Sequence, residues 1–384
     1  MKDRKVRLLH VTTVPMSLMF LKGQLNFYME NGFEVHVISS PGEFLDEFCN
    51  EEGVVKHEIK MERDISIIND IKSLLKMIKV IKRNNFDIVH THTPKASLLG
   101  VLSAFICGVK VRIYHMHGLV YITKKGLKRK LLYLMEKITT FFATTIYAVS
   151  PSLKELVVKE KLTYKGKIHT INKGSINGID CINHFNPALY NLKQYKEELS
   201  LTDDDFIIGF VGRVVKEKGF LELYYAWRKL FNKNINIKLL IVGDLEGASE
   251  LPKEVLSDIE SNSNIEYVGF QKNPAPFYKL MNILVFPTYR EGFGLVAIES
   301  LAMETPVIAS NVVGCVDTIE NGVTGFLIPP HSIKDIVQKV EFYYNNRSVL
   351  KNHGQMGRKK VMNDYPRKEI WESMLQEYNE KLKG

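Results

Sequence analysis

Two adjoining stretches in the second half of the chain decide the expected fold. The first is a continuous apolar run closed by proline, Ile283-Leu284-Val285-Phe286-Pro287. The second is a glycine-broken loop that leads into small and apolar residues, Tyr289-Arg290-Glu291-Gly292-Phe293-Gly294-Leu295-Val296-Ala297-Ile298-Glu299. A continuous apolar run is typical of a buried parallel strand. The pattern therefore predicts a strand, a loop and a helix N-terminus, with an acid on each side of the loop.

This loop has the chemistry of a binding site for phosphate and hydroxyl groups. The N–H groups at a helix start, with the positive end of the helix dipole, attract phosphate. The carboxylates of Glu291 and Glu299 can accept hydrogen bonds from hydroxyls. Phosphate and polyol recognised together suggest a sugar nucleotide. The alternative is a buried strand-to-helix turn with two solvated acids.

The rest of the chain alternates strand-like and helix-like segments. Strands are expected at Val6–Val11, Glu34–Ser39, Val54–Ile59, Asp87–Thr91, Val111–His115, Thr145–Val149, Ile168–Ile171, Phe206–Val211, Ile237–Val242, Ile265–Val268, Ile283–Phe286, Val307–Ala309 and Gly325–Ile328. Helical patterns fall at Ile67–Lys82, Leu127–Phe142, Phe220–Leu230, Glu254–Asn262, Ala275–Leu280, Leu295–Met303, Ile333–Tyr344 and Arg367–Leu382. This alternation predicts two doubly wound parallel sheets, with a linker near residues 180–195 and a binding cleft between their facing strand ends.

Composition limits the class of protein. A chain of 384 residues with 45% hydrophobic and 25% charged residues suits a soluble two-domain protein. The four cysteines stand singly, which favours neither a zinc knuckle nor a disulfide framework. No segment approaches the roughly 18 uninterrupted apolar residues of a membrane span. We therefore expect a cytoplasmic protein.

Positive charge is concentrated in one region. Residues 60–145 contain 16 Lys and Arg against 5 Asp and Glu, while the rest of the chain has a net charge of −2. This local excess suggests an anionic partner, such as membrane lipid, a phosphorylated acceptor or nucleic acid. The alternative is a solvated helix face, because several of the basic residues recur at helical spacing.

Further polar groups follow other predicted strands. Phe210-Val211-Gly212-Arg213-Val214-Val215-Lys216-Glu217-Lys218-Gly219 would place Arg213 and Lys218 at a strand's carboxyl end, where they suit a diphosphate. His90-Thr91-His92 and His115-Met116-His117 could each direct two imidazoles to one face. No acid accompanies these histidines, so a substrate-binding histidine, His117, is favoured over a metal site.

Taken together, these motifs resemble the retaining glycosyltransferases of family 4, which have the two-domain GT-B architecture. Glu291–Glu299 looks like the E-x₇-E motif of that family, and Gly212–Gly219 looks like its diphosphate-binding loop. Asn177-Gly178-Ile179-Asp180 resembles the family's linker. The two histidine pairs are similar to those of bacterial exopolysaccharide and lipid-linked oligosaccharide transferases. The resemblance covers nearly the whole chain.

The resemblance implies two Rossmann-like domains facing across a cleft. Residues 1–185 would bind the acceptor, residues 186–365 would bind the nucleotide sugar, and helix 366–384 would pack back on the first domain. The implied reaction is retaining transfer of a hexose or N-acetylhexosamine from a UDP-linked donor to a hydroxyl of a lipid-linked saccharide, in the synthesis of a bacterial exopolysaccharide or capsule. No metal ion or other cofactor is implied.

The resemblance also implies roles for individual residues. Glu291 would contact hydroxyls of the donor sugar and Glu299 those of the ribose, while the base would lie near Phe270 and Gln271. The diphosphate would be held by Gly212, Arg213, Lys218 and the loop and helix start formed by Gly292, Phe293, Gly294, Leu295 and Val296. The expected catalytic group is Arg213, Lys218, Glu291 and His117.

One loop departs from the family pattern. Many members have paired glycines close to the donor phosphates, but here a single glycine, Gly23, remains among bulky apolar residues. Gly23 is the candidate donor contact of this loop, and a lipid or the acceptor is the alternative partner. The basic and then apolar stretch 124–132 suggests peripheral attachment to the anionic inner face of the plasma membrane.

Two rival functions remain open at this point. A non-hydrolysing UDP-sugar epimerase uses the same architecture, but no acid/base residues at the sugar can be assigned. A non-catalytic sugar-nucleotide-binding subunit is disfavoured by the intact Glu291, Glu299, Arg213 and Lys218. A nucleic-acid binder would explain the basic region but not the second domain, so nucleic acid is not an expected partner.

Overall fold

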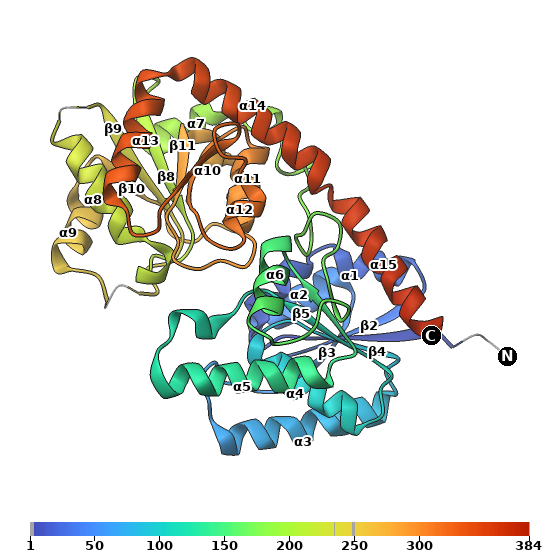
Figure 1. Ribbon diagram of the computed structural model, residues 1–384. Helices are drawn as coiled ribbons and strands as arrows, with labels where there is room; N and C mark the ends of the chain where they lie inside the picture. Colours follow the sequence, from blue (N-terminus) through green and yellow to red (C-terminus); the bar gives the residue numbers. More distant parts are fainter. Residues whose placement is uncertain (1–3, 234, 248–249, 384) are drawn as a thin grey trace. The chain divides into compact units, whose positions relative to one another are not determined.

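The chain folds into two compact units, as seen in a computed structural model that describes residues 4–233, 235–247 and 250–383 (Figure 1). Unit 1 comprises Met1–Gly178 and Arg367–Gly384, and unit 2 comprises Ile179–Pro366. Each unit is built on one parallel sheet flanked by helices. The predicted class, α/β with two doubly wound parallel sheets, is confirmed.

Unit 1 has a seven-stranded sheet in the order β3-β2-β1-β4-β5-β6-β7. Its strands are β1 Val6–Val11, β2 Phe33–Ser39, β3 Val55–Glu58, β4 Ile88–Thr91, β5 Val111–Met116, β6 Thr145–Ala148 and β7 Ile168–His169. Its helices are α1 Gln24–Glu30, α2 Glu43–Glu52, α3 Ile67–Asn84, α4 Pro94–Ile106, α5 Gly126–Phe142, α6 Pro151–Lys159 and α15 Arg367–Lys383, with 3₁₀ helices η1 Pro15–Leu21 and η2 Val120–Thr123.

The two faces of the unit 1 sheet have different chemistry. Side chains alternate between the faces of a strand, so neighbours in β1 point in opposite directions. Leu9 and Val11 pack into an apolar core with residues of α3 and α4. His10, between them, lies on the other face, where it stacks on Tyr28 of α1. Figure 1 shows α3, α4 and α5 on the first face and α1 and α15 on the second.

Unit 2 has a six-stranded sheet in the order β10-β9-β8-β11-β12-β13. Its strands are β8 Phe206–Val211, β9 Ile237–Val242, β10 Ile265–Tyr267, β11 Ile283–Phe286, β12 Val307–Ser310 and β13 Gly325–Ile328. Its helices are α7 Leu192–Glu198, α8 Phe220–Phe231, α9 Lys253–Ser261, α10 Ala275–Leu280, α11 Leu295–Ala302, α12 Cys315–Thr318, α13 Ile333–Asn345 and α14 Arg347–Asp364, with 3₁₀ helices η3 Pro187–Leu189 and η4 Lys216–Lys218.

The predicted strands agree with the observed ones except at their ends. No helical segment was predicted for α1, α2, α4, α6, α7, α12 or α14, and α14 is the longest of these. Its sequence contains two glycines, which weaken a helical pattern. The structure shows why they are there. A Cβ on Gly354 would lie 2.1 Å from the carbonyl oxygen of Glu304, and one on Gly357 would lie 2.5 Å from a methyl carbon of Leu301. The glycines therefore let α14 pack closely against the end of α11.

Helix length and polarity decide whether a helix can cross a membrane. Within the described residues, every helix falls short of the length and apolarity that a membrane crossing requires.

Candidate functional site

The candidate site lies in unit 2 where the loops that follow β8 and β11 meet. These strands are neighbours, with Ile208 opposite Ile283 and Gly209 opposite Leu284. The strand order departs from β8 in both directions, to β9 on one side and to β11 on the other. Such a switch point is where parallel α/β sheets bind ligands, beyond the carboxyl ends of the strands.

A lysine and a glutamate predicted to act on the same donor form an ion pair in this site. Nζ of Lys218 lies 2.7 Å from Oε2 of Glu291, and the two side chains are 26% and 19% exposed. Burial raises the pKa of Glu291, but the Lys218 ammonium and the Gly292 N–H bonded to its other oxygen outweigh that effect. The net pKa of Glu291 is lowered, so its carboxylate is ionised at neutral pH.

The backbone brings these two loops together. The N–H of Tyr289 donates to the carbonyl oxygen of Glu217 at 3.0 Å. Gly219 adopts φ +72°, and a Cβ at this position would lie 2.0 Å from the carbonyl oxygen of Pro287. Only glycine allows this approach. Lys218, which immediately precedes this glycine, is placed beside Glu291 as a result.

Helix α11 begins next to Glu291. Gly294, at φ +86°, is its N-cap and offers no side chain to cap the helix. Gly292 and Gly294 are buried, Leu295 and Val296 are partly exposed, and Phe293 packs its ring against that of Tyr365 at a centroid distance of 5.2 Å. The loop is therefore held in place by packing, and binding of phosphate at its helix start remains a prediction.

The second glutamate of the motif, Glu299, lies within α11 and is held by a residue that the sequence did not single out. The hydroxyl of Tyr278 in α10 donates to Oε2 of Glu299 at 2.8 Å. Burial, and then the adjoining Glu299 carboxylate, raise the pKa of this tyrosine, so it remains a donor. Glu299 is partly exposed, as a contact to a ribose would require.

Arg213 occupies a different part of the site. Its side chain is exposed, and Nη1 lies 2.9 Å from Oε2 of Glu246, which follows β9. The described residues show no hydrogen bond or ion pair between Arg213 and either Lys218 or Glu291. Gly212, at φ +135°, makes the turn out of β8. The structure thus places the two predicted diphosphate-binding cations with different acidic partners.

The two residues predicted to lie near the base follow the edge strand β10. Phe270 is 54% exposed, which leaves its ring accessible. Nε2 of Gln271 donates to the carbonyl oxygen of Val268 at 2.7 Å and so fixes the loop. Both residues belong to the same strand-end side of the sheet as the loops after β8 and β11.

In unit 1 the structure brings the predicted histidine pairs together. The rings of His90, His92, His115 and His117 form one cluster, with centroid separations between 4.5 and 5.8 Å. His10, from β1, joins the cluster, and its position could be known only from the strand order. His117 lies at the strand-end edge of this cluster and stacks on Phe20 at 5.1 Å.

Gly23 has a packing role within unit 1. Its N–H donates to Oε1 of Glu52 at 2.7 Å. Its φ is +80°, and a Cβ there would lie 2.9 Å from the Trp371 ring of α15. The indole N–H of Trp371 in turn donates to Oδ1 of Asn177 at 2.6 Å. These contacts explain the glycine without a ligand, and contact between Gly23 and a donor remains a prediction.

Comparisons with known proteins identify the family of the chain. Residues 192–360 match the family "Glycosyl transferases group 1", and residues 25–180 match "Glycosyltransferase Family 4". The chain is similar to the capsular polysaccharide biosynthesis glycosyltransferase CapM of Staphylococcus aureus, at 40% identity over 100% of this chain and 99% of that protein. It is also similar to the UDP-Gal:α-D-GlcNAc-diphosphoundecaprenol α-1,3-galactosyltransferase of Escherichia coli, at 29% identity over 79% and 78% of the two chains.

A solved structure supports the fold. The complex of Anabaena Alr3699/HepE with UDP-glucose has a TM-score of 0.81 to this chain at 15% identity, covering 97% of this chain and 99% of that one. Fold and site therefore define a glycosyltransferase of the GT-B class. The chain belongs to the family 4 glycosyltransferases, as its motifs suggested, and it is an enzyme of that class. The comparisons do not favour an epimerase or a non-catalytic subunit.

Proposed function

We propose that this enzyme transfers a hexose or N-acetylhexosamine, with retention, from a UDP-linked donor to a hydroxyl of a lipid-linked saccharide during bacterial capsule or exopolysaccharide synthesis. Similarity to the capsular enzyme of S. aureus supports the biosynthetic setting. The name of the E. coli relative, with UDP-Gal and a diphosphoundecaprenol acceptor, supports the donor and acceptor classes. The observation that carries the proposal is the convergence of Lys218, Glu291 and the start of α11 at adjoining strand ends.

The proposed mechanism follows from the charge that develops on the leaving group. Breaking the bond from sugar to phosphate leaves negative charge on the diphosphate. Lys218, Arg213 and the N–H groups at the start of α11 stabilise this charge most in the transition state. Glu291 orients the donor sugar through its hydroxyls and Glu299 orients the ribose. His117 is the proposed substrate contact in unit 1.

We propose that this chemistry requires no metal ion. Two cationic side chains and a helix start supply the positive charge that a bound cation would otherwise bring to a diphosphate. Within the described part of the chain, the group suited to hold a metal consists of His10, His90 and His92 in unit 1. It contains no acid, and it belongs to a different unit from the diphosphate loop.

A matched pair of variants tests the assignment of the diphosphate site. Arg213→Ala is expected to lower the transfer rate by about a hundred- to a thousandfold, the usual effect of removing one transition-state donor. Its melting temperature should change little because Arg213 is exposed. Lys216→Ala, an exposed cation of the same loop, is the control. Transfer by Arg213→Ala at a rate near that of the unmodified enzyme contradicts the proposal.

We further propose that unit 1 rests on an anionic membrane on the cytoplasmic side, where a lipid-linked acceptor is presented. The helices on one face of its sheet, α3, α4 and α5 (Figure 1), expose large apolar side chains, and α3 and α5 also expose lysines. These side chains are Ile67, Ile68, Ile71 and Leu75 of α3, Phe105 and Ile106 of α4, and Leu127, Leu131, Leu134 and Phe141 of α5. Apolar and basic residues on one face are the signature of interfacial binding.

Sedimentation with vesicles tests this surface. The enzyme should bind vesicles that contain phosphatidylglycerol, less tightly as salt rises, and should not bind neutral vesicles. Replacing both Lys128 and Lys130 by Gln removes about 2 kcal/mol of attraction, or roughly thirtyfold in affinity. Lys229→Gln in unit 2 is the control. Absence of binding would leave α5 as an ordinary solvated helix, and salt-insensitive binding would contradict the proposed attraction to anionic lipid.

A further inference from the structure

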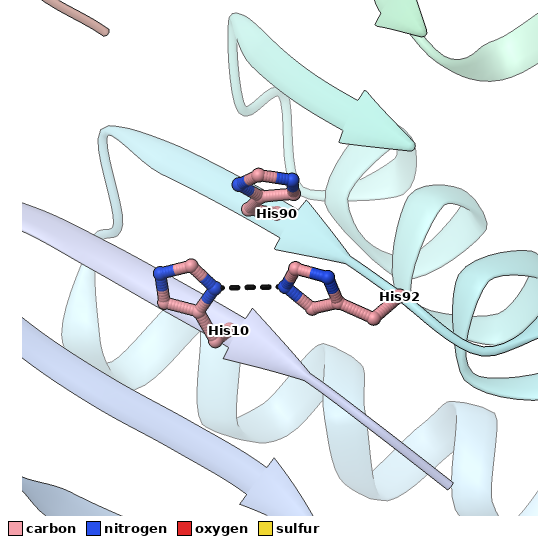
Figure 2. A group of neighbouring side chains, drawn as sticks. All are labelled: His10, His90 and His92. Atoms are coloured by element: carbon pink, nitrogen blue, oxygen red, sulfur yellow. Dashed lines mark hydrogen bonds between the residues drawn. The ribbon is translucent and has the colours of Figure 1, made fainter. Parts of the chain in front are cut away.

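Five histidines gather on three neighbouring strands of unit 1. His10 comes from β1, His90 and His92 from β4 and the residue after it, and His115 and His117 from β5 and the residue after it. Figure 2 shows three of them, with the rings of His10 and His92 directed toward one another. The rings of His10, His90, His92 and His115 are buried, whereas that of His117 is partly exposed.

These imidazoles are neutral at neutral pH. Burial lowers the pKa of His10 to about 3 and that of His117 to about 4. Burial, together with the neighbouring histidines, lowers the pKa of His90, His92 and His115 well below the ordinary value. Each ring therefore has one N–H donor and one nitrogen acceptor, and the hydrogen bond at one nitrogen sets the state of the other.

A row of hydrogen bonds joins three of the rings, from His10 through His92 to His117. Nδ1 of His10 lies 2.9 Å from Nε2 of His92, and Nδ1 of His92 lies 3.4 Å from Nε2 of His117. Each contact holds one proton, so the neutral rings must all donate in the same direction. Either His10 donates toward His117, or His117 donates toward His10.

The buried end of this row of hydrogen bonds, at His10, decides the direction of donation. Nε2 of His10 is buried and has no hydrogen-bond partner among the described residues. If His117 donated toward His10, this nitrogen would carry an N–H without an acceptor. If His10 donates through Nδ1, its Nε2 carries only a lone pair. Orphaned N–H groups are rarer in protein interiors than under-satisfied acceptors. The proton of each pair is therefore supplied by Nδ1 of His10 and Nδ1 of His92.

We propose that His10 and His92 are positioning residues that hold His117 in the tautomer protonated on Nδ1. Nε2 of His117 is then an acceptor for His92, and its Nδ1–H is left for a ligand. The described residues provide no hydrogen-bond partner for this Nδ1, and the stacked Phe20 ring fixes the plane of the imidazole. His117 thereby offers a donor to a substrate oxygen. That last step rests on the proposed function, whereas the tautomer does not.

A transition metal is the competing explanation of the cluster. One nitrogen from each of His10, His90 and His92 lies within 4.8 Å of the others. Both ring nitrogens of His92 are already engaged, one with His10 and one with His117, so a bound ion would have to displace one of these hydrogen bonds. His90 is also engaged, because its Nδ1 lies 2.5 Å from the hydroxyl of Tyr378 and its Nε2 lies 3.2 Å from Nδ1 of His115. The hydrogen-bonded arrangement engages both nitrogens of His90 and of His92 and, among the described residues, leaves only Nε2 of His10 without a partner in this group, so we favour it.

Nuclear magnetic resonance of the full chain with ¹⁵N-labelled histidine tests the tautomer directly. The His117 signals, assigned by their loss in His117→Asn, should show a proton on Nδ1 and a bare Nε2. A proton on Nε2 overturns the proposal; the measurement is made on the unmodified protein, and His117→Asn serves only to assign its signals. Stoichiometric uptake of Zn²⁺ that shifts the His10 and His92 signals also overturns it, because the ion would displace one of the hydrogen bonds of His92.

Variants then separate positioning from transfer. His92→Leu should release His117 into a mixture of tautomers and lower kcat about fivefold, the equivalent of one hydrogen bond. His36 is a buried histidine of β2 outside this row of hydrogen bonds, so His36→Gln should change neither the His117 tautomer nor kcat. An unaltered His117 tautomer in His92→Leu refutes the positioning role. An altered tautomer with unchanged transfer refutes the use of the Nδ1–H on substrate, while the Arg213→Ala result tests the transferase itself.

Discussion

The ion pair between Lys218 and Glu291 gives the most quantitative prediction. Lys218→Met keeps the length of the side chain but removes the ammonium, which leaves the carboxylate of Glu291 in its partly buried loop. Breaking a fully buried pair costs about 3–5 kcal/mol, whereas an exposed pair contributes about 0–1 kcal/mol. Because these side chains are 26% and 19% exposed, we expect a loss of about 2–3 kcal/mol.

Thermal unfolding measures this loss. For a unit of the size of Ile179–Pro366, each kcal/mol lowers the melting temperature by about 2–4 °C, so Lys218→Met should melt about 5–10 °C lower. Lys216→Met, an exposed lysine of the same loop, is the matched control and should melt with the unmodified protein.

A double-mutant cycle attributes the effect to the pair. Glu291→Gln removes the charge that Lys218→Met leaves unpaired. The double variant should therefore be more stable than the sum of the single losses predicts, by at least about 1 kcal/mol. Additive losses, or a Lys218→Met melting temperature equal to that of the control, would refute the inference that the pair organises this loop. Both single variants should also lose transfer activity.

Two further predictions concern a buried acid and a glycine. Burial raises the pKa of Glu136 to about 7, although the Tyr114 hydroxyl at 2.9 Å opposes the shift. The folded chain then keeps a proton that the unfolded chain releases above pH 4.5, so stability falls as pH rises from about 4.5 to 7, by about 3 kcal/mol. Measured by urea unfolding, the stability of Glu136→Gln relative to the unmodified protein should be greater at pH 8 than at pH 5. The exposed control Glu155→Gln should show no such change with pH. A stability difference for Glu136→Gln that does not depend on pH counts against a raised pKa of the buried acid. Gly314→Ala should cost about 1–3 kcal/mol of folding free energy, because Gly314 is at φ +85° and its Cβ would lie 2.7 Å from the backbone of Gly292 and Phe293. The variant should also weaken the proposed binding of UDP in calorimetry; unchanged binding would show that the loop tolerates the contact.

The sequence by itself determined the class of fold and the outline of the donor loop. Apolar runs alternating with helical patterns predict parallel sheets, because burial on both faces requires such runs. A glycine-broken helix start predicts phosphate binding, because helix N-termini attract anions. Glu291 and Glu299 on either side of it predict the binding of hydroxyls, because carboxylates accept their hydrogen bonds. These features are local, so they could be recognised without knowing which strands are neighbours.

Only the tertiary structure decided which of these groups meet. Lys218 pairs with Glu291 because β8 lies beside β11, and His10 joins His92 because β1 lies beside β4. Strand order follows from how helices cover the two faces of a sheet, which a linear pattern does not contain. Helix α14 escaped prediction for a related reason, since Gly354 and Gly357 weaken the helix locally and are justified only by the surface on which it packs. Local chemistry is thus legible in the chain, whereas partners far apart in sequence are set by packing.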